Sequence, residues 1–236
     1  MKKLIKIILT IAMFSQLSFA SSEKIKIDIV SDVVCPWCAI GYKRLSVAID
    51  ELGLKDKVEI VWHPFELNPD MPREGTNANK YLMDKYGLSE QKLKETRNRV
   101  TTLGKETGFK FDYFAKMRKV NSFNSHILLK YAKEFNKQTL LKVRLQNAYF
   151  GERKDISNRE VLFEELQAVG LNAKEAMKRL DDKNEIKAIE DEEKFWRDQG
   201  VQAIPTIIFN NEFAQVGADE IKTYKEILTQ LSSKLK

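Results

Sequence analysis

Cysteine and histidine are both rare in this sequence. Its 236 residues include only two cysteines, Cys35 and Cys38, and two histidines, His63 and His126. A zinc site built on the two thiols would need both histidines as further ligands, but the ligands of compact zinc modules come in closely spaced pairs. Because His63 and His126 are far apart in the chain, the sequence argues against a zinc site. We expect neither a metal nor an organic cofactor.

Blocks of basic residues with interleaved aromatic residues, which are typical of nucleic-acid-binding proteins, are also missing. Basic and acidic residues instead alternate along the predicted helices, as they do on solvated helix surfaces. The formal net charge of the whole chain is +6; without Lys2, Lys3 and Lys6, 37 basic residues remain against 34 acidic ones. We therefore do not expect nucleic acid as a partner.

Long hydrophobic runs are absent. The apolar run Ile7–Phe14 is shorter than the roughly 18 to 20 residues that a membrane-spanning helix needs. It follows lysines and precedes the small-residue pattern Ser18-Phe19-Ala20, which is typical of a signal cleavage site. We predict that residues 1–20 are a secretory signal peptide, with a transmembrane anchor as the alternative. The mature protein would then be periplasmic or otherwise extracytoplasmic, without stable membrane insertion.

Two thiols separated by two residues raise the question of their purpose. In an exported protein they could form a structural disulfide. A disulfide between Cys35 and Cys38 closes an almost minimal loop, however, and the entropy that a cross-link removes from the unfolded chain grows with loop length. Since such a bond adds little to the stability of a chain of this size, we interpret the pair as a redox-active dithiol.

The residues around the dithiol predict a strand followed by a helix. Lys24–Val30, KIKIDIV, alternates polar and apolar residues, and AIGYKRLSVAIDELG after Cys38 places apolar residues on one helix face. Pro36 suits the first helical turn, where its missing N–H is not needed. The free N–H groups and the positive dipole end of this helix would stabilise the Cys35 thiolate. We therefore predict that Cys35 is an exposed nucleophile and that Cys38, one turn further in, is shielded and resolves the mixed disulfide.

The rest of the chain is mainly helical. A second strand is predicted at Lys57–Trp62, so that the cysteine-bearing helix connects two parallel strands. Helical periodicity then continues to about residue 182, with predicted helices at Asn77–Tyr86, Ser89–Thr107, Ser122–Phe135, Lys137–Phe150, Asn158–Val169 and Asn172–Leu180. The remaining elements are a helix at Glu185–Gln199, a strand at Ala203–Asn210, a short hairpin into EFAQVG and a helix at Asp219–Leu235.

Two strands are thus separated from two others by a long helical segment, with a C-P-x-C motif at the start of the first helix. This is the plan of thioredoxin-fold proteins of the DsbA type, and five stretches resemble the FrnE subgroup of that family. They are SDVVCPWCAIG (31–41), HPFELNPDMP (63–72), NSFNSHILLKYA (121–132), AYFGERKDISNREVL (148–162) and GVQAIPTIIFN (200–210). The resemblance implies an α/β, thioredoxin-like fold, βαβ followed by ββα around a central mixed sheet, that is interrupted by an all-α insertion. We expect residues 21–67 and 183–236 to form the two parts of the thioredoxin-like domain and residues 68–182 to form the helical insertion.

The resemblance also implies a role for each site residue. Cys35 attacks, Cys38 resolves the mixed disulfide, and Pro205 occupies the family's cis-proline position facing the disulfide. Pro36 supports the active-site turn. The backbone of Ile204 would then face the thiols and pair with an extended segment of a client protein. The implied partners are unfolded or partly folded exported proteins with cysteines, and a membrane redox partner that resets the thiols.

Trp37 stands between the cysteines, where DsbA-type oxidases often carry histidine. An indole has one N–H and no charge. Because a less stabilised thiolate makes a dithiol a weaker oxidant, we expect a less oxidising couple than in the strongest family members. The expected role of Trp37 is an apolar platform that faces the substrate, with packing at the helix start as the alternative. The direction of exchange stays open between oxidase and isomerase or reductase.

Four further features are assigned structural roles. His126 is expected to be a structural histidine in an apolar helix face, and Asp32 to be a cap or turn residue. We expect no catalytic role for His63. The aromatic stretch Asp112–Met117, DYFAKM, is expected to form the core of the insertion, with a substrate groove as the alternative.

Two alternatives to disulfide exchange with proteins remain. Relatives that share the helical insertion include glutathione-dependent isomerases of small aromatic compounds. Those relatives carry serine in place of the attacking cysteine, whereas this sequence keeps both Cys35 and Cys38. The other alternative is a non-enzymatic periplasmic holdase whose insertion binds unfolded chains.

Overall fold

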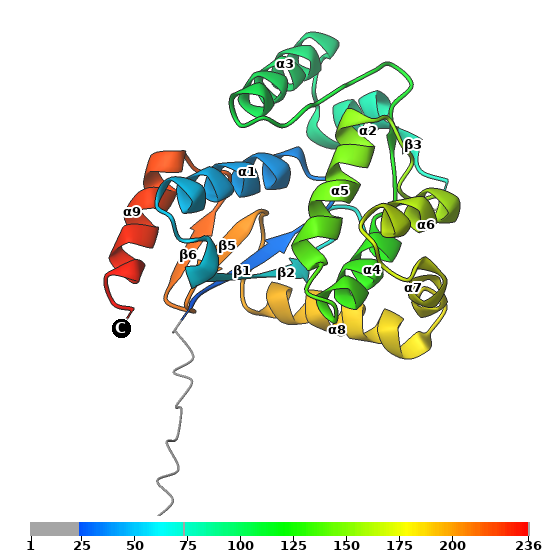
Figure 1. The fold of residues 1–236 in the computed structure, drawn as a ribbon. Helices are drawn as coiled ribbons and strands as arrows, with labels where there is room; N and C mark the ends of the chain where they lie inside the picture. Colours follow the sequence, from blue (N-terminus) through cyan, green and yellow to red (C-terminus); the bar gives the residue numbers. More distant parts are fainter. Residues whose placement is uncertain (1–23, 73, 236) are drawn as a thin grey trace, which may run out of the picture.

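The computed structural model describes residues 24–72 and 74–235, so the predicted signal peptide lies outside the described residues. Its centre is a four-stranded sheet in the order β2-β1-β5-β6 (Figure 1). The strands are β1 (Ile25–Ser31), β2 (Val58–Pro64), β5 (Thr206–Phe209) and β6 (Phe213–Val216). β1 and β2 are parallel, whereas β5 is antiparallel to both β1 and β6. The mixed sheet expected from the sequence is confirmed.

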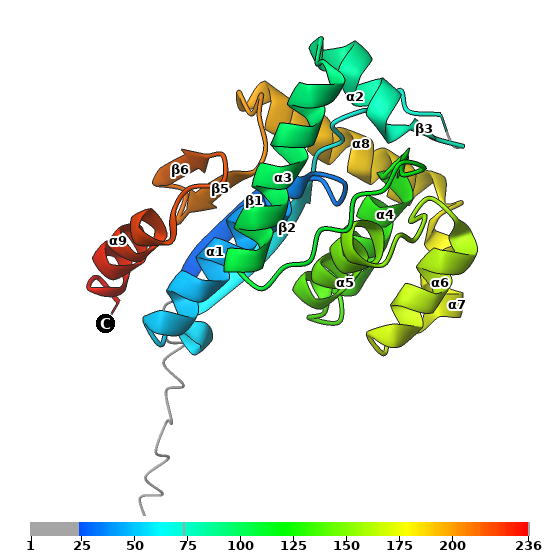
Figure 2. The same ribbon diagram turned by 90° about the horizontal axis from the view of Figure 1, so that it is seen from above.

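Helices cover both faces of this sheet. α1 (Pro36–Glu51) connects β1 to β2 and packs beside α9 (Ile221–Ser232), while α8 (Lys183–Asp198) lies against β2 on the opposite face (Figures 1 and 2). Because side chains alternate along a strand, Ile27 and Ile29 of β1 point to the same face, where they pack with α1 and α9. The two sequence-distant parts of the sheet therefore share one apolar core.

Between β2 and α8, the described residues form six helices. They are α2 (Ala78–Tyr86), α3 (Glu90–Glu106), α4 (Phe123–Lys133), α5 (Gln138–Gly151), α6 (Arg159–Ala168) and α7 (Ala173–Arg179). Each lies within a few residues of a predicted helix, because polar side chains mark where several of them begin. Asn77, Ser89 and Asn158 accept hydrogen bonds from backbone N–H groups in the first turns of α2, α3 and α6.

Three short elements have no counterpart in the predictions. A 3-10 turn at Lys55–Lys57 precedes β2, and the two-residue strands β3 (Thr76–Asn77) and β4 (Arg118–Lys119) pair antiparallel within the insertion. A two-residue strand is too short to leave a periodic pattern in the sequence. Gly75 permits the close approach of the two chain segments, since a Cβ atom there would lie 2.4 Å from the Lys119 carbonyl oxygen.

The insertion packs directly on the segment that carries the cysteines. Val34 and Ile40, at the end of the turn after β1 and in α1, belong to the same buried cluster as Leu128 of α4 and Leu145 of α5. The predicted domain boundaries at 67/68 and 182/183 stay predictions. Among the described residues, no helix combines the length and apolar character needed to span a membrane.

Candidate active site

Cys35 and Cys38 lie where β1 gives way to α1. Cys35 is the N-cap residue of α1, with an extended backbone, and Pro36 occupies the start of the helix. The Cys35 carbonyl oxygen accepts a hydrogen bond from the Ala39 N–H at 3.4 Å, so the helix begins directly after the first thiol. The first turn of α1, all of it described, contains no acidic residue. The positive end of the helix dipole is therefore directed at Cys35 without an opposing carboxylate on that turn.

Both thiols are buried, so the predicted exposure of Cys35 is wrong. Cys35 is 3% exposed and Cys38 is 1% exposed. The Ile204 carbonyl oxygen lies 4.0 Å from Cys35 Sγ, and the helical insertion packs against Val34 and the start of α1. The prediction failed because the periodicity of a strand and a helix carries no information about distant segments that fold over their junction. A sulfur that reacts with Cys35 must enter between these segments.

The two thiols differ in acidity. A hydrogen bond from the Cys38 thiol is the main cause that lowers the pKa of Cys35, against the opposing effects of burial and of Asp32. The Cys38 N–H and the positive charge of Lys119 also lower it. Burial raises the pKa of Cys38 well above the ordinary thiol value, and its contacts with Cys35 raise it further. Cys35 is therefore the thiol that ionises first, and Cys38 keeps its proton.

The loop before β5 faces the thiols. The Ile204–Pro205 peptide bond is cis, Pro205 is buried and Ile204 is half-buried. Pro205 packs against α1 at Gly41, where an added Cβ atom would lie 3.2 Å from Pro205 Cγ. The structure thus brings Cys35, Ile204 and Pro205 together from opposite ends of the chain.

Two lysines of the insertion hold the active-site turn, residues 32–35, and the end of β1 before it. Lys119 of β4 donates a hydrogen bond from Nζ to the Val34 carbonyl oxygen at 3.1 Å. Lys142 of α5 donates from Nζ to the Ser31 carbonyl oxygen at 3.4 Å. Both lysines are buried, and Lys142 is 0% exposed. The insertion therefore fixes the backbone of the active-site turn through two long, charged side chains.

Burial lowers the pKa of both lysines. It lowers the pKa of Lys142 to about 8, although the two thiols and Asp32 favour the charged form. Burial also lowers the pKa of Lys119, whereas the negative charges of Asp32 and Cys35 raise it. Because a cation near a thiol favours the thiolate, the two lysines promote ionisation of the dithiol in addition to the dipole of α1.

Asp32 does bind the turn, as expected, and it is fully buried. Its Oδ1 accepts a hydrogen bond from the Val34 N–H at 3.2 Å, and its Oδ2 accepts one from the Leu67 N–H at 2.9 Å. Burial alone raises the pKa of Asp32, but His126, Lys119 and the Leu67 N–H outweigh burial and hold this pKa below its usual range. An ionised Asp32 therefore ties the active-site turn to the segment that follows β2.

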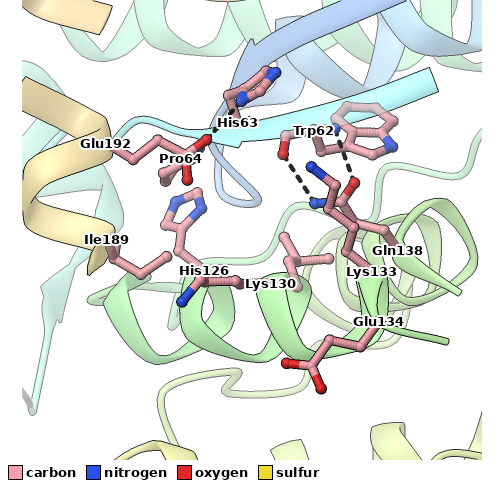
Figure 3. Close-up of a pocket in the computed structure, with 11 residues that line it drawn as sticks. Trp62, His63, Pro64, His126, Lys130, Lys133, Glu134, Gln138, Ile189 and Glu192 are labelled. Carbon is pink, nitrogen blue, oxygen red and sulfur yellow. Dashed lines mark hydrogen bonds and ion pairs between the residues drawn. The ribbon is translucent and has the colours of Figure 1, made fainter. Parts of the chain in front are cut away.

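The two histidines line one pocket between β2, α4 and α8, with a volume of about 370 Å³. Figure 3 shows the His126 ring directed from α4 toward Glu192 of α8. His126 Nε2 lies 3.6 Å from Asp32 Oδ1, so His126 contacts a residue of the active-site turn. The ring nitrogens of His63 lie 2.7 Å from Asp28 Oδ1 and 2.6 Å from Glu192 Oε1, which joins β1, β2 and α8. Among the described residues, no group of three or more histidine, cysteine, aspartate or glutamate side chains is arranged so that it could hold a metal ion.

Two buried glutamates extend this group of titratable residues. The Glu66 N–H, just after β2, donates a hydrogen bond to Glu193 Oε1 of α8 at 2.9 Å. Burial, together with the negative charges of Glu193 and Asp32, raises the pKa of Glu66 to about 8. Burial likewise raises the pKa of Glu193. Glu66 therefore retains its proton at neutral pH.

Sequence reasoning missed Lys119, Lys142 and Glu66. Lys142 left a signal, because it lies on the buried face of α5 beside Leu141 and Leu145, where an isolated lysine is unusual. Lys119 and Glu66 left none, since both lie in short segments that have neither helical nor strand periodicity.

Trp37 is partly buried and joins the active-site turn to α3. The guanidinium carbon of Arg99, on α3, lies 5.6 Å from the centre of the indole ring. The ring also packs against the apolar cluster of the insertion. Its role as a platform for substrate stays a prediction.

Comparisons with known proteins match this architecture. Residues 26–229 match the family model of the DSBA-like thioredoxin domain. Similar solved structures include a probable DsbA oxidoreductase from Streptomyces coelicolor, with a TM-score of 0.83 at 23% identity, covering 89% of this chain and 91% of that chain. The cytosolic disulfide reductase DsbM from Pseudomonas aeruginosa gives a TM-score of 0.62 at 18% identity, covering 88% of this chain and 99% of that chain.

A 2-hydroxychromene-2-carboxylate isomerase also has a similar structure, with a TM-score of 0.65 at 16% identity, covering 89% of this chain and 97% of that chain. Comparison with curated proteins gives no match to the chain. At these identities, the likeness to solved structures describes the fold alone, and the chemistry has to be argued from the site.

Proposed function

The chain belongs to the family of DSBA-like thioredoxin domains, and we propose that it is an exported thiol-disulfide oxidoreductase that exchanges disulfides with protein substrates. One observation carries the proposal: the two adjacent thiols differ in acidity. The pKa of Cys35 is lowered at the helix start, while the pKa of Cys38 beside it is raised. An exchange reaction needs one thiolate that attacks and one thiol held in reserve, whereas a structural disulfide needs neither.

Each exchange moves two electrons between the protein dithiol and the client. In the oxidising direction, a client thiolate attacks Sγ of Cys35 in the Cys35–Cys38 disulfide. A mixed disulfide forms, and Cys38 leaves as a thiolate that takes up a proton. A second client thiolate then attacks the client sulfur of the mixed disulfide, which completes the client disulfide and releases the Cys35 thiolate. The lowered pKa of Cys35 favours this last step, because a thiol of lower pKa leaves faster.

In the reducing direction, the Cys35 thiolate attacks a client disulfide and Cys38 must lose its proton to resolve the adduct. Burial opposes this ionisation, whereas the positive charge of Lys142 and the Asp32 N–H favour the Cys38 thiolate. Lys142 therefore helps the step in which Cys38 attacks Cys35 Sγ and expels the client thiolate.

The client segment is proposed to pair with the backbone at Ile204. This rests on the Ile204 carbonyl oxygen, which lies 4.0 Å from Cys35 Sγ, so a peptide bound there would bring its own sulfur next to Cys35. Trp37, without a charge, is proposed to give a less oxidising couple, which fits either an oxidase or an isomerase. No metal or organic cofactor takes part in the proposed exchange.

The proposed site of action is the periplasm or another extracytoplasmic compartment, to which residues 1–20 would direct the chain as a cleaved signal peptide. Disulfides persist in such compartments. The proposed partners are unfolded or partly folded exported proteins with cysteines, and a membrane redox partner that resets the dithiol.

Trapping the covalent intermediate tests the proposal. With a reduced, unfolded cysteine-containing client and a small disulfide as oxidant, Cys38→Ala should accumulate a mixed disulfide with the client that dithiothreitol releases, because the resolving thiol is missing. Cys35→Ser should accumulate none. If Cys38→Ala forms no adduct while wild type and variant are equally folded, the proposed exchange is wrong.

A second measurement determines the direction of exchange. The Cys35–Cys38 equilibrium in glutathione buffers gives the reduction potential; a value near about −270 mV indicates a reductive role and one near about −120 mV an oxidase.

Two experiments test the alternative functions. If the Cys35→Ser, Cys38→Ser double variant keeps full activity in cells and prevents aggregation as well as wild type, the holdase alternative is correct. Glutathione-dependent isomerisation that survives alkylation of both thiols would instead support the isomerase alternative.

A further inference from the structure

His63, near the end of β2, lies between two carboxylates that belong to other elements. Its Nε2 lies 2.7 Å from Asp28 Oδ1 of β1. Its Nδ1 lies 2.6 Å from Glu192 Oε1 of α8, the contact that Figure 3 shows. A neutral imidazole donates from one ring nitrogen and carries a lone pair on the other, whereas an imidazolium donates from both. Because ionised carboxylates only accept, both short contacts form together only when His63 is protonated.

The contact with Asp28 is more shielded than the contact with Glu192. The side chains of His63 and Asp28 are 13% and 3% exposed, and Lys26 pairs with the other oxygen of Asp28 at 3.0 Å. The Glu192 side chain is 33% exposed. A change in the charge of His63 therefore displaces Glu192, at the surface, more readily than Asp28, inside the sheet.

The other charged or titratable groups near His63 come from α4 and α8. Those of α4 line the same pocket and are His126, Lys130, Lys133 and Glu134. Lys130 pairs with Glu185 at 2.6 Å, and Glu134 pairs with Arg179 at 3.3 Å. Glu193 of α8 accepts the hydrogen bond of the Glu66 N–H. Asp28 and Glu192 are thus the carboxylates that contact the ring of His63 directly.

Trp196 is the second residue of α8 that contacts His63. The two ring centroids lie 4.6 Å apart, with the planes at 54°. Residues four apart lie on one face of a helix, so Glu192 and Trp196 face β2 together. A cation beside an aromatic ring is attracted to it. The charge of His63 therefore holds this face of α8 against β2 through both residues.

Trp196 in turn holds the loop that carries Ile204. The Trp196 carbonyl oxygen accepts a hydrogen bond from the Val201 N–H at 3.1 Å. Trp196 and Ile204 also pack against one small buried cluster, which consists of Val30, Phe65 and Val201. The Ile204 carbonyl oxygen lies 4.0 Å from Cys35 Sγ. Direct contacts thus run from His63 through α8 to the backbone beside the reactive sulfur.

We propose that protonated His63 is a positioning residue, which holds α8 and thereby the backbone at Ile204 in the arrangement that pairs with a client segment. This rests on the proposed function, because it takes Ile204 as the place where the client pairs. Loss of the His63 proton sets a lone pair against a carboxylate at one of the two short contacts. Histidine changes its charge between about pH 5 and 8. Pairing of the client should therefore weaken as pH rises through this range.

Two neutral disulfides with a shared leaving group test the proposal. One is 2-hydroxyethyl disulfide, and the other is an extended, uncharged peptide whose single cysteine is joined to 2-mercaptoethanol by a disulfide. Alkylation at timed intervals gives the rate at which each oxidises the reduced protein. Both reactions need the Cys35 thiolate, so the ratio of the peptide rate to the small-reagent rate is independent of its ionisation. In wild type this ratio should fall about fivefold between about pH 5.5 and 8.5, less than the loss of a whole charge-assisted hydrogen bond.

Three variants assign the pH dependence. The ratio for His63→Gln should not vary with pH, because glutamine stays neutral. Glu192→Gln should also lose most of the variation, since an amide pairs with either protonation state of His63. Glu134→Gln is the matched control, because it removes the same charge from the lining of the same pocket. Its ratio should stay within about twofold of wild type at every pH.

The wild-type protein alone provides a further measurement if a variant does not fold. The chain has only two histidines, so the ring signals of His63 can be followed by NMR. The midpoint of the fall in the ratio should coincide with the titration of these signals. A ratio that is constant with pH in wild type, a fall that persists in His63→Gln or a midpoint that differs from the titration overturns the proposal.

One more outcome separates this proposal from the proposed function. If wild type shows no preference for the peptide at any pH, His63 positions nothing and pairing at Ile204 is wrong as well. Disulfide exchange through Cys35 still stands in that case, because the Cys38→Ala adduct reports on it separately.

Discussion

At the scale of single residues, the active site contains a lysine in an unusual position. Lys142 is fully buried, and its Nζ donates one recorded hydrogen bond, 3.4 Å long, to the Ser31 carbonyl oxygen. Its Nζ also lies 5.1 Å from the centre of the Trp62 ring. Burial lowers its pKa to about 8, which shows that desolvation outweighs the attraction of the thiols. Lys142 therefore lowers the stability of the fold, while its charge favours the thiolates of the dithiol.

Lys142→Met should therefore stabilise the fold and weaken the chemistry. We expect the free energy of unfolding at pH 7 to rise by roughly 1 to 3 kcal/mol, because an apolar side chain of similar length replaces a buried cation. The rate at which Cys38 resolves a mixed disulfide should fall, because the cation that favours its thiolate is gone. Urea unfolding and the decay of a purified mixed disulfide measure the two effects.

The pH dependence of the same variant checks the cause. The pKa of Lys142 is lower in the folded protein than in the unfolded chain, so the unfolded chain binds more protons between about pH 8 and the ordinary lysine pKa near 10.4. The stability contribution of Lys142 therefore rises with pH in that window, and Lys142→Met should lack this rise. Lys133→Met, at an exposed position of α4, is the control and should change stability by less than about 0.5 kcal/mol. A destabilised Lys142→Met would contradict the prediction.

At the scale of elements, α3 packs closely against the aromatic segment that follows it, and Gly104 is the residue at which the two meet. A Cβ atom at Gly104 would lie 2.5 Å from Phe111 Cδ2 and 2.6 Å from the Phe109 carbonyl oxygen. Phe109 and Phe111, just before the stretch Asp112–Met117, are buried, but within that stretch only Met117 is buried, so the expected core role holds only in part. Tyr113 lines a surface groove between α2 and α3. Residues of DYFAKM and its neighbours thus contribute both to the core of the insertion and to the lining of a surface groove. The pattern of aromatic residues in the sequence does not distinguish these two roles.

Gly104→Ala should destabilise the protein by about 1 to 3 kcal/mol, the usual penalty for overpacking a filled core, because the helix and the aromatic segment must separate. Thermal unfolding measures the loss. Lys105→Ala, one residue further on the exposed side of α3, is the control and should be nearly neutral. An unchanged unfolding temperature in Gly104→Ala would show that α3 moves freely on this segment.

At the scale of the whole molecule, the redox state of the Cys35–Cys38 pair is coupled to the stability of the fold. The charges around the dithiol come from the turn itself and from two parts of the insertion: Asp32, Lys119 and Lys142. These groups assemble only in the folded chain. The acidity of Cys35 is therefore a property of the native state, and through linkage it contributes to the free energy of folding.

The reduced and oxidised proteins should differ in how stability varies with pH. In the reduced protein the pKa of Cys35 lies below that of the unfolded thiol, about 8.5, so the unfolded chain binds more protons between the two pKa values. This contribution is fully present above the unfolded pKa and is lost as pH falls through the folded pKa. The oxidised protein has no thiol at this position and lacks the effect.

Urea unfolding of both forms between about pH 5 and 7.5 measures this difference, because at higher pH the raised pKa of Cys38 opposes it in the reduced form alone. The free energy of unfolding of the reduced form, minus that of the oxidised form, should rise with pH. Glu66, whose raised pKa makes stability fall as pH rises toward about 8, is present in both forms and largely cancels. When Cys35→Ala takes the place of the reduced wild type in this subtraction, the difference should not rise with pH. A pH-independent difference in the wild type would mean that the Cys35 thiolate is not stabilised by folding.

The sequence by itself determined the elements and the pairing of the two thiols. Local patterns predicted the strand-to-helix junction and nearly every helix. These patterns are the alternation of polar and apolar residues over 24–30, the helical periodicity through the insertion, and Pro36 after Cys35. The five quoted stretches extended this to the thioredoxin-like plan. Cys35 and Cys38 could be assigned as a pair because their spacing is itself a local property.

Only the tertiary structure decided the environment of that pair. The burial of Cys35, the hydrogen bonds of Lys119 and Lys142 to the turn and the contacts of His63 with Asp28 and Glu192 depend on segments far apart in the chain. A charged residue in the sequence is solvated by default, and only packing removes its water. Because desolvation and distance set the pKa of each group, the acidity of the site exists only once the insertion has folded onto the sheet.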